Sequence, residues 1–458
     1  MEARGPGIDT TEGNIRGLIL SLSWPAIVRM LLVMSVGIVD IMMIGRLGEE
    51  DPLAAVGLSN QYLWLFYSLI GGVSVGTTAL IAQHLGAKER EEASRIAKQS
   101  ILLGSLLALA VSIPTALNSE QLILWLGATD KVAELGGAYL RIVLGVLFFS
   151  FNLWMVNAIF QGAGNTKTPM YIMAFVNTLN IALDYLLIFG IGPFPKLGVI
   201  GAATASAVSR ILGAVIGWTL LLKGRYGVTL SLGGVLKPYL REMKRILWVG
   251  LPASIEMLLR SGSNLFYMFI IASLGTTAIA AHQVAIRAES FSYMPGFGFA
   301  IAATTIVGQN IGAGKRERAE RSGLEASYLA LLFMGFMGII FFLFPFQFMG
   351  IFTVNEKVIE LGAPCLMIVA LSEPGLALNM VLAGGLRGAG DTRYPMIITG
   401  FGSWCIRLPL AYFLAITLGY GLIGAYMAMT FDVILRGIIM LVRFRSEKWK
   451  EMNLRKLK

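Results

Sequence analysis

The residues best suited to chemistry lie in an apolar stretch between positions 166 and 192. Met173, Asn177, Asn180 and Asp184 recur there at steps of four, three and four residues, which places all four on one face of a helix. The stretch is long enough to cross a bilayer, where a carboxylate costs roughly 2.5–3.5 kcal/mol on insertion scales. We therefore expect this polar face to line a water-filled cavity, and we interpret it as the centre of a transport site.

The composition indicates a polytopic membrane protein. Of the 458 residues, 56% are hydrophobic and only 14% are charged, a balance that is rare in soluble proteins. Cys365 and Cys405 both lie in apolar segments, so a disulfide framework is not expected. His84 and His282 have no second ligand beside them in the sequence, so a metal centre built on histidine is not expected either.

Twelve apolar segments of spanning length follow one another along the chain, and they predict an all-α protein with twelve transmembrane helices. The segments cover residues 17–46, 53–84, 94–117, 132–162, 167–192, 197–222, 241–275, 278–310, 320–346, 357–387, 394–418 and 420–443. Several are longer than a bilayer requires, so we expect them to tilt or to extend beyond the membrane.

Basic residues alternate between the two sets of connections. One set of loops carries Arg46, Lys131, Lys196 and Lys357, and the other loops and both termini carry many more. The positive-inside rule then predicts that both termini are cytoplasmic. The net charge of +10 is therefore interpreted as a topology signal, and nucleic acid is not an expected partner.

The chain also repeats itself at a nearly constant shift. Gly162-Ala163-Gly164 recurs as Gly388-Ala389-Gly390, and Pro25-Ala26 recurs as Pro252-Ala253, so the two shifts differ by a single position. Six segments per half is an even number, so the halves should be related by an axis along the membrane normal, with a central cleft between two pseudo-symmetric six-helix lobes. The predicted parts are a cytoplasmic N-terminus (1–16), a first lobe (17–222), a basic linker (223–240), a second lobe (241–443) and a cytoplasmic tail (444–458).

The chain resembles the prokaryotic multidrug and toxic compound extrusion (MATE) transporters over almost its whole length. The resemblance is carried by Trp24-Pro25 with Asp40, by QGAGNTKTP at 161–169 and RGAGDTRYP at 387–395, and by the stretch 289–314. It implies a plasma-membrane antiporter that exports small cationic or amphipathic drugs while Na⁺ or H⁺ enters, with alternating access. We expect a monomer in the lipid bilayer, with no enzymatic activity and no cofactor besides the coupling ion. No ATP-binding P-loop occurs in the sequence.

Asp40 and Asp184 are the acidic candidates of the first lobe, and counting along their segments places them at similar depth in the outer half. With Asn180 they would form an oxygen-rich site for Na⁺, the metal that this set predicts. Proton binding is the alternative, because burial and a neighbouring like charge favour a neutral carboxyl group. The alternative to both is a structural role, in which each aspartate caps polar backbone groups or lies in the interface. The resemblance favours the cation site and implies a hydroxyl from the sixth segment, either Thr204 or Ser206, of which we favour Thr204.

Substrate contacts are predicted deeper in the same lobe. Asn157 lies further toward the cytoplasm than Asp184 by residue counting, and Met173 and Asn177 share the polar face of the fifth segment. Plain packing is the alternative for the methionine. Pro25 removes a backbone hydrogen bond, so we interpret it as a hinge, with a static kink as the alternative.

The second lobe carries Glu256, Glu289 and Glu373 as secondary candidates. Charge neutralisation is the simpler interpretation, because Glu256/Arg260 and Asp432/Arg436 have the i, i+4 spacing of helical ion pairs. Against it, MATE relatives of other branches use acidic residues on the seventh, eighth and tenth segments, where these three glutamates lie.

A lipid-linked oligosaccharide flippase is the alternative function, because those flippases resemble the MATE transporters in fold. They usually carry additional helices and a strongly cationic cavity, whereas this chain has twelve segments and an acidic first lobe. An intramembrane enzyme is not expected, because no catalytic histidine or cysteine cluster occurs.

Overall fold

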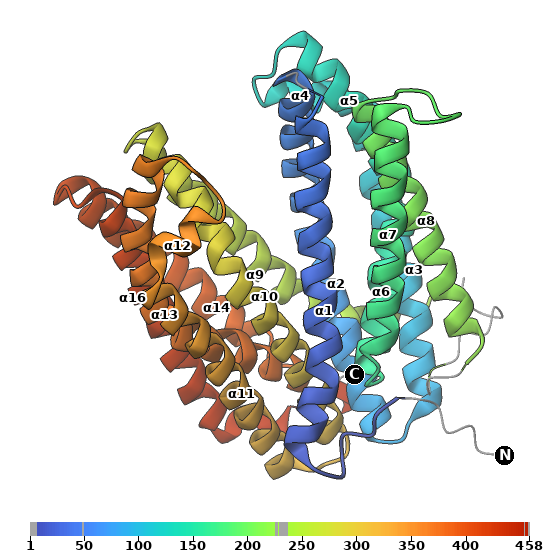
Figure 1. Ribbon diagram of the computed structural model, residues 1–458. Coiled ribbons are helices and arrows are strands. Elements are labelled where there is room, and N and C mark those ends of the chain that lie inside the picture. Colours follow the sequence, from blue (N-terminus) through green and yellow to red (C-terminus); the bar gives the residue numbers. More distant parts are fainter. Residues whose placement is uncertain (1–6, 48–49, 225–227, 229–236, 453, 457–458) are drawn as a thin grey trace. The chain divides into compact units, whose positions relative to one another are not determined.

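The protein is described by a computed structural model that covers residues 7–47, 50–224, 228, 237–452 and 454–456. These residues form helices joined by short connections, and no strand occurs among them (Figure 1). The prediction of an all-α protein is confirmed. Parts of the predicted N-terminus (1–16), linker (223–240) and tail (444–458) lie outside the described residues.

The helices follow the predicted segments in order. In the first half they are α1 (Ile15–Gly45), α2 (Glu50–Gly86), α3 (Arg90–Leu117), α4 (Ser119–Trp125), α5 (Asp130–Gly145), α6 (Leu147–Gly162), α7 (Lys167–Phe189) and α8 (Val199–Leu222). In the second half they are α9 (Leu240–Ala272), α10 (Thr276–Gly312), α11 (Arg316–Leu343), α12 (Pro345–Gly350), α13 (Glu356–Ala389), α14 (Arg393–Phe401), the π-helix η1 (Gly402–Arg407), α15 (Leu408–Tyr412), the π-helix η2 (Phe413–Thr417), α16 (Gly421–Arg445) and the short 3₁₀ helices η3 (Glu447–Glu451) and η4 (Leu454–Lys456).

Ten of the described helices are long and apolar enough to cross a membrane, and the bent pair α5–α6 makes eleven if it is one span. The predicted segment 132–162 is not straight, because the two helices meet at a bend of 50° beside Val146, which leaves helical geometry with φ −105° and ψ 11°. The seventh predicted segment corresponds to α9, which has 33 residues. Its charged residues, among them Glu256 and Arg260, set it apart from the more apolar spans.

The described chain divides into two compact units. The first unit contains Val28–Gly250 with Met1–Ile8, and the second contains Asp9–Ile27 with Leu251–Leu457. Two of the boundaries between the units therefore lie inside helices. The helix α1 begins in the second unit and continues in the first, and α9 begins in the first unit and continues in the second. The lobes predicted from the sequence begin and end in the connections between segments, because contacts made by the first turns of a helix leave no pattern in the sequence. Two of the changes of unit, between Ile27 and Val28 in α1 and between Gly250 and Leu251 in α9, lie close to Pro25 and Pro252.

The internal repeat is also a repeat of turn geometry. The Glu89 amide donates to the His84 carbonyl at 2.8 Å, and at the equivalent place in the second half Lys315 donates to Asn310 at 2.9 Å. The left-handed position of this turn is Lys88 (φ 65°) in the first half and Gly314 (φ 76°) in the second. Because the same bonds close both turns, the duplication seen in the sequence is retained in the folded halves.

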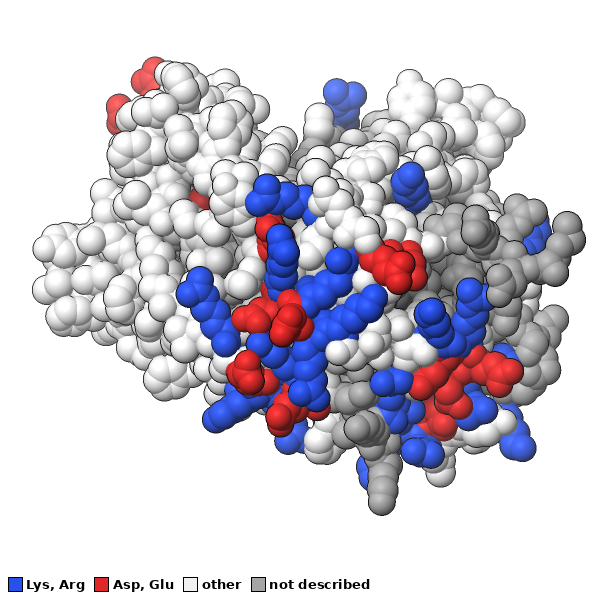
Figure 2. All heavy atoms as spheres, turned by 90° about the horizontal axis from the view of Figure 1, so that it is seen from below, with Lys and Arg blue, Asp and Glu red and all other residues white. Residues whose placement is uncertain are grey.

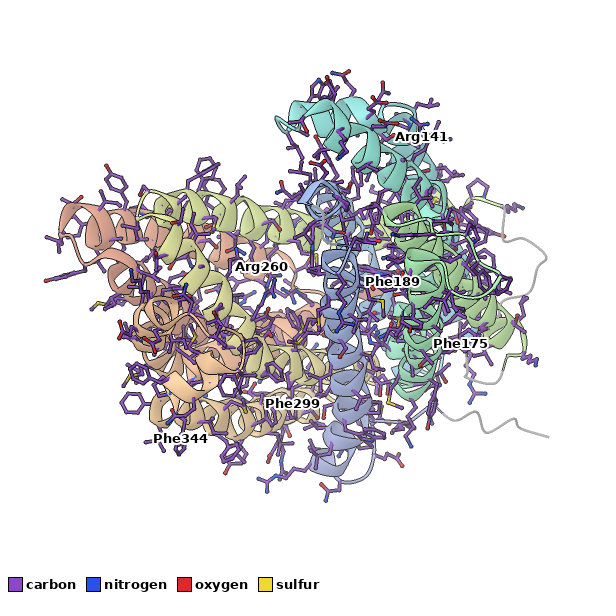
Figure 3. All side chains as sticks on the ribbon, turned by 45° about the horizontal axis from the view of Figure 1, so that its top comes forward. Arg141, Phe175, Phe189, Arg260, Phe299 and Phe344 are labelled. Atoms are coloured by element: carbon purple, nitrogen blue, oxygen red, sulfur yellow. The ribbon has the colours of Figure 1, made fainter. Side chains whose placement is uncertain are left out.

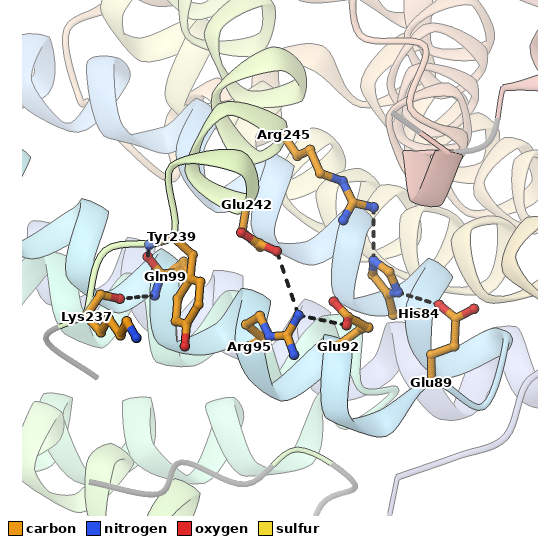
Figure 4. Close-up of polar contacts among 9 residues, drawn as sticks. All are labelled: His84, Glu89, Glu92, Arg95, Gln99, Lys237, Tyr239, Glu242 and Arg245. Atoms are coloured by element: carbon orange, nitrogen blue, oxygen red, sulfur yellow. Dashed lines mark hydrogen bonds and ion pairs between the residues drawn. The ribbon is translucent and has the colours of Figure 1, made fainter. Parts of the chain in front are cut away.

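A network of polar side chains fastens the start of α9 to the α2–α3 turn inside the first unit (Figure 4). His84 contacts Glu89 through Nδ1 at 2.7 Å and Arg245 through Nε2 at 3.2 Å. Gln99 donates to the Lys237 carbonyl and accepts from the Tyr239 amide, both at 3.0 Å. Lys and Arg side chains are interspersed with acidic ones on the side that Figure 2 draws.

Candidate functional site

The carboxyl groups of Asp40 and Asp184 face each other inside the first unit. Asp184 on α7 is fully buried, and Asp40 on α1 is partly buried. The two groups lie close enough to interact electrostatically. Neither oxygen of Asp184, nor Oδ1 of Asp40, receives an N–H or O–H donor from the described residues. A buried pair of carboxyl groups without donors requires a proton or a metal cation for its stability.

Asn180 lies one helical turn from Asp184 on the same face of α7. Its Nδ2 donates to Ser206 Oγ on α8 at 3.5 Å, and its Oδ1 has no donor among the described residues. The Thr204 hydroxyl instead donates to the Ile200 carbonyl of its own helix at 2.8 Å. The structure thus brings Ser206, rather than the favoured Thr204, to the amide, while the role of Thr204 in ion binding stays a prediction.

The packing of α7 against α8 sets the depth of the site residues. A Cβ added at Gly201 would lie 2.6 Å from the Leu187 carbonyl oxygen, and Gly213 packs against Val176, so the two helices run antiparallel in close contact. In this register Asp184 lies level with Thr204 and Met173 lies level with Val215. These levels are about 11 residues apart on α8, or roughly 16 Å at the helical rise of 1.5 Å.

The predicted substrate residues lie at the deeper level. Gly217 of α8 packs against Val156 of α6, which places the neighbouring Asn157 near the level of Met173. Asn157 and Asn177 are both buried, and Asn157 Oδ1 and Asn177 Nδ2 have no partner among the described residues. Unsatisfied buried amide atoms are costly unless a ligand or water completes them. This arrangement suits a binding site that is separate from the aspartate pair.

Arg210 is the residue of this region that sequence analysis missed. It lies one turn beyond Ser206 on α8 and donates from Nη1 to the Tyr67 hydroxyl of α2 at 2.6 Å. Asp40 and Tyr139 are within Coulombic range of its guanidinium. The available signal was an arginine inside an apolar segment at i, i+4 from a candidate hydroxyl. Spacing alone did not single it out, because no acidic residue lies three or four positions from it on the same segment.

Glu256 has a different partner from the one that its spacing predicts. Arg387 of α13 donates to Glu256 Oε1 at 2.6 Å, and Thr399 of α14 donates to the same oxygen at 3.3 Å. The predicted partner Arg260, labelled in Figure 3, contributes only through a longer-range charge interaction. The i, i+4 pairing is therefore wrong for Glu256. The interpretation as charge neutralisation fits its position, because the residue is buried and ion-paired.

Glu289 on α10 and Glu373 on α13 form a second acidic neighbourhood, within the second unit. Glu373 is fully buried, and its Oε2 accepts a hydrogen bond from Ser292 at 2.6 Å. Its Oε1 has no donor among the described residues, and Glu289 is within Coulombic range. Both stay secondary candidates for ion binding.

Asp432 is held by two arginines. It accepts from Arg436 at 2.6 Å, as its i, i+4 spacing predicts, and from Arg407 of η1 at 2.9 Å. The group neutralises charge within the second unit and has a structural role. Pro25, in contrast, lies inside a continuous α1, next to the change of unit.

Comparison with known proteins agrees with these features. The sequence profile of the MatE family matches residues 25–186 and 252–413, once in each half. A protein named "Probable multidrug resistance protein NorM" from Thermotoga maritima is 35% identical over 439 residues, which cover 96% of this chain and 94% of the relative. Crystal structures of MATE in the straight and in the bent conformation are each 25% identical with a TM-score of 0.89; both comparisons cover 99% of this chain, and 99% and 98% of the respective relatives. The chain therefore belongs to the MatE family, a family of membrane transporters.

Proposed function

We propose that the protein is a secondary antiporter that exports cationic amphipathic compounds, multidrug substrates among them, in exchange for Na⁺ or H⁺. The proposal rests above all on the Asp40–Asp184 pair, whose buried oxygens lack donors in the described part of the chain. A monovalent cation supplies what the pair lacks. The name of the Thermotoga relative supports drugs as the substrate class.

Coupling requires that the ion favours one conformation over another. Occupation of the aspartate pair would remove the repulsion between α1 and α7 and allow α1 to bend near Pro25, which would reduce the space available to a compound near Asn157 and Met173. Solved relatives in straight and bent conformations support such a change. Pro25 and the change of unit beside it make this part of α1 suitable as a hinge.

The remaining properties follow from the sequence. The protein would lie in the plasma membrane as a monomer with both termini in the cytoplasm, because the basic connections alternate by side. Transport would require no ATP, no enzymatic step and no cofactor other than the coupling ion. The oligosaccharide flippase is not favoured, because the relatives are multidrug resistance proteins and MATE structures.

Efflux of a cationic dye from proteoliposomes tests the proposal. The dye is loaded inside, in vesicles whose inserted transporters face outward as in the cell, and an inward Na⁺ gradient or an inward proton gradient is imposed, each alone. We expect one gradient to drive efflux that an ionophore for that ion abolishes. Dye efflux that is independent of both gradients, or no efflux under either, would overturn the antiport proposal.

A further inference from the structure

Arg210 lies between the two candidate sites of the first unit. By the α7–α8 register it is level with Thr178, about one turn deeper than the Asn180–Ser206 contact and five residues of α7 from Met173. Along α8, the level of the ion site lies on one side of Arg210 and the level of the predicted substrate residues lies on the other. A fixed positive charge at this position acts electrostatically on a cation bound at either of the two sites.

The guanidinium is held by a neutral partner. Its Nη1 donates to the Tyr67 hydroxyl at 2.6 Å, and its central carbon lies 5.9 Å from the centre of the Tyr67 ring. Tyr67 is itself stacked on Trp154 of α6, with ring centroids 5.1 Å apart. No carboxylate of the described residues comes within 4.0 Å of Arg210. The aromatic wall thus keeps the arginine close to Asp40 without an ion pair.

Asp40, Asp184 and Arg210 form a group of charged side chains whose charges largely cancel. Two ionised carboxylates and one guanidinium carry a net charge of −1, since arginine remains protonated in proteins. Tyr139 of α5 is within Coulombic range of Asp40, Asp184 and Arg210, so the three charged groups share one environment. Binding of one Na⁺ or H⁺ makes the sum zero and leaves the guanidinium without a compensating negative charge on its deeper side.

We propose that Arg210 converts cation binding at Asp40 and Asp184 into repulsion of a cationic compound bound near Asn157, Met173 and Asn177. The inference rests on the proposed antiport function and adds the residue that couples its two sites. With the aspartates ionised, their net negative charge attracts the compound. With one aspartate neutralised or bridged by Na⁺, Arg210 repels the compound, so the two ligands exclude each other without touching.

The same geometry specifies the substrate charge. A cationic compound should respond strongly, because it loses the attraction of the net negative charge while Arg210 remains positive. An uncharged amphipathic compound of similar size should bind with an affinity that the coupling ion hardly alters. One monovalent ion per cycle is sufficient to cancel the net negative charge of Asp40, Asp184 and Arg210.

Binding of ethidium to the purified protein, followed by fluorescence anisotropy, tests the role of Arg210. The Kd is measured without and with saturating coupling ion for the wild type and for Arg210→Gln, Arg210→Lys and the exposed control Arg141→Gln (Figure 3). We expect the ion to raise the Kd by about tenfold or more in the wild type, within the usual range of coupling between sites. The control and Arg210→Lys should retain that factor, and Arg210→Gln should reduce it to about twofold or less.

The outcomes separate this inference from the antiport proposal. If the ion does not weaken ethidium binding in the wild type, the antiport proposal itself is wrong. If the wild type shows the effect and Arg210→Gln retains it in full, only the role of Arg210 is wrong. Should Arg210→Gln fail to run as a single species in size-exclusion chromatography, Tyr67→Phe decides. Loss of the 2.6 Å bond to the Tyr67 hydroxyl frees the Arg210 guanidinium to pair with Asp40. Displacement of half of the bound ethidium should then need about fivefold more coupling ion. A displacement curve identical to that of the wild type would refute the inference.

Discussion

Arg387 donates from Nη2 to Oε1 of Glu256 at 2.6 Å, which joins the end of α13 to the middle of α9 within the second unit. Glu256 is buried and Arg387 is largely buried. A buried ion pair of this kind costs little to keep once it is formed, but removal of one partner leaves the other charge uncompensated.

Glu256→Gln should therefore act on stability before it acts on transport. We expect a loss of about 3 kcal/mol in the free energy of unfolding, measured by thermal unfolding in detergent. The double variant Glu256→Gln with Arg387→Gln should recover much of that loss, because no isolated charge remains. Full stability combined with lost ion coupling in the single variant would instead assign Glu256 to the ion pathway.

Asp40→Asn and Asp184→Asn should each reduce coupled dye efflux to the level of empty vesicles. The amide retains the shape of the side chain but removes the charge that binds the cation, so folding and insertion should persist. Asp130→Asn, at an exposed position at the start of α5, is the matched control and should pump normally. Normal pumping by both variants, together with an inactive Glu373→Gln, would place the ion site in the second unit.

Ser206 should contribute more to ion binding than Thr204. Ser206→Ala removes the acceptor that orients Asn180, and a lost hydrogen bond of about 1 kcal/mol corresponds to a roughly fivefold weaker affinity. Thr204→Ala removes only a bond to the helix's own Ile200 carbonyl and should change the affinity by less than about twofold. Half-saturating ion concentrations for dye efflux measure both. The reverse order would favour Thr204 as the ligand.

Gly402 is required where η1 passes the Asp432 group. An added Cβ would lie 2.5 Å from Asp432 Oδ1 and 2.6 Å from Arg436 Cδ. Gly402→Ala should therefore displace both side chains and destabilise the protein by about 2 kcal/mol, read as a lower Tm. Gly335→Ala on α11 is the control, because no atom lies within 4 Å of its added Cβ. Equal Tm values for the two variants would contradict the tight packing around Gly402.

The topology can be read by labelling single cysteines from outside the cell. In a background with Cys365 and Cys405 replaced, a cysteine at Val354, which is 96% exposed, should react with an impermeant maleimide. Cysteines at Arg90 and Arg316, both exposed, should react only after the membrane is permeabilised. Labelling of the basic positions from outside would reverse the predicted orientation.

The sequence by itself determined the helical membrane fold, the duplication and the acidic candidates. Each of these depends on spacing along the chain: apolar runs of bilayer length, motifs that recur at one nearly constant shift, and polar residues three or four positions apart on one helix. Asp184 stands out because a carboxylate is expensive in an apolar segment. The Asp432–Arg436 pair was predictable for the same reason, since both partners lie on one helix.

The tertiary structure alone decided which helices bring their polar residues together. Spacing orders the faces of a helix, but it does not specify how far a neighbouring helix is rotated or shifted. For that reason Glu256 pairs with Arg387 rather than with Arg260, and Ser206 rather than Thr204 meets Asn180. Arg210 became a candidate only when the packing of α8 placed it beside Tyr67 and near Asp40, because its long side chain reaches partners on helices that are distant in the sequence.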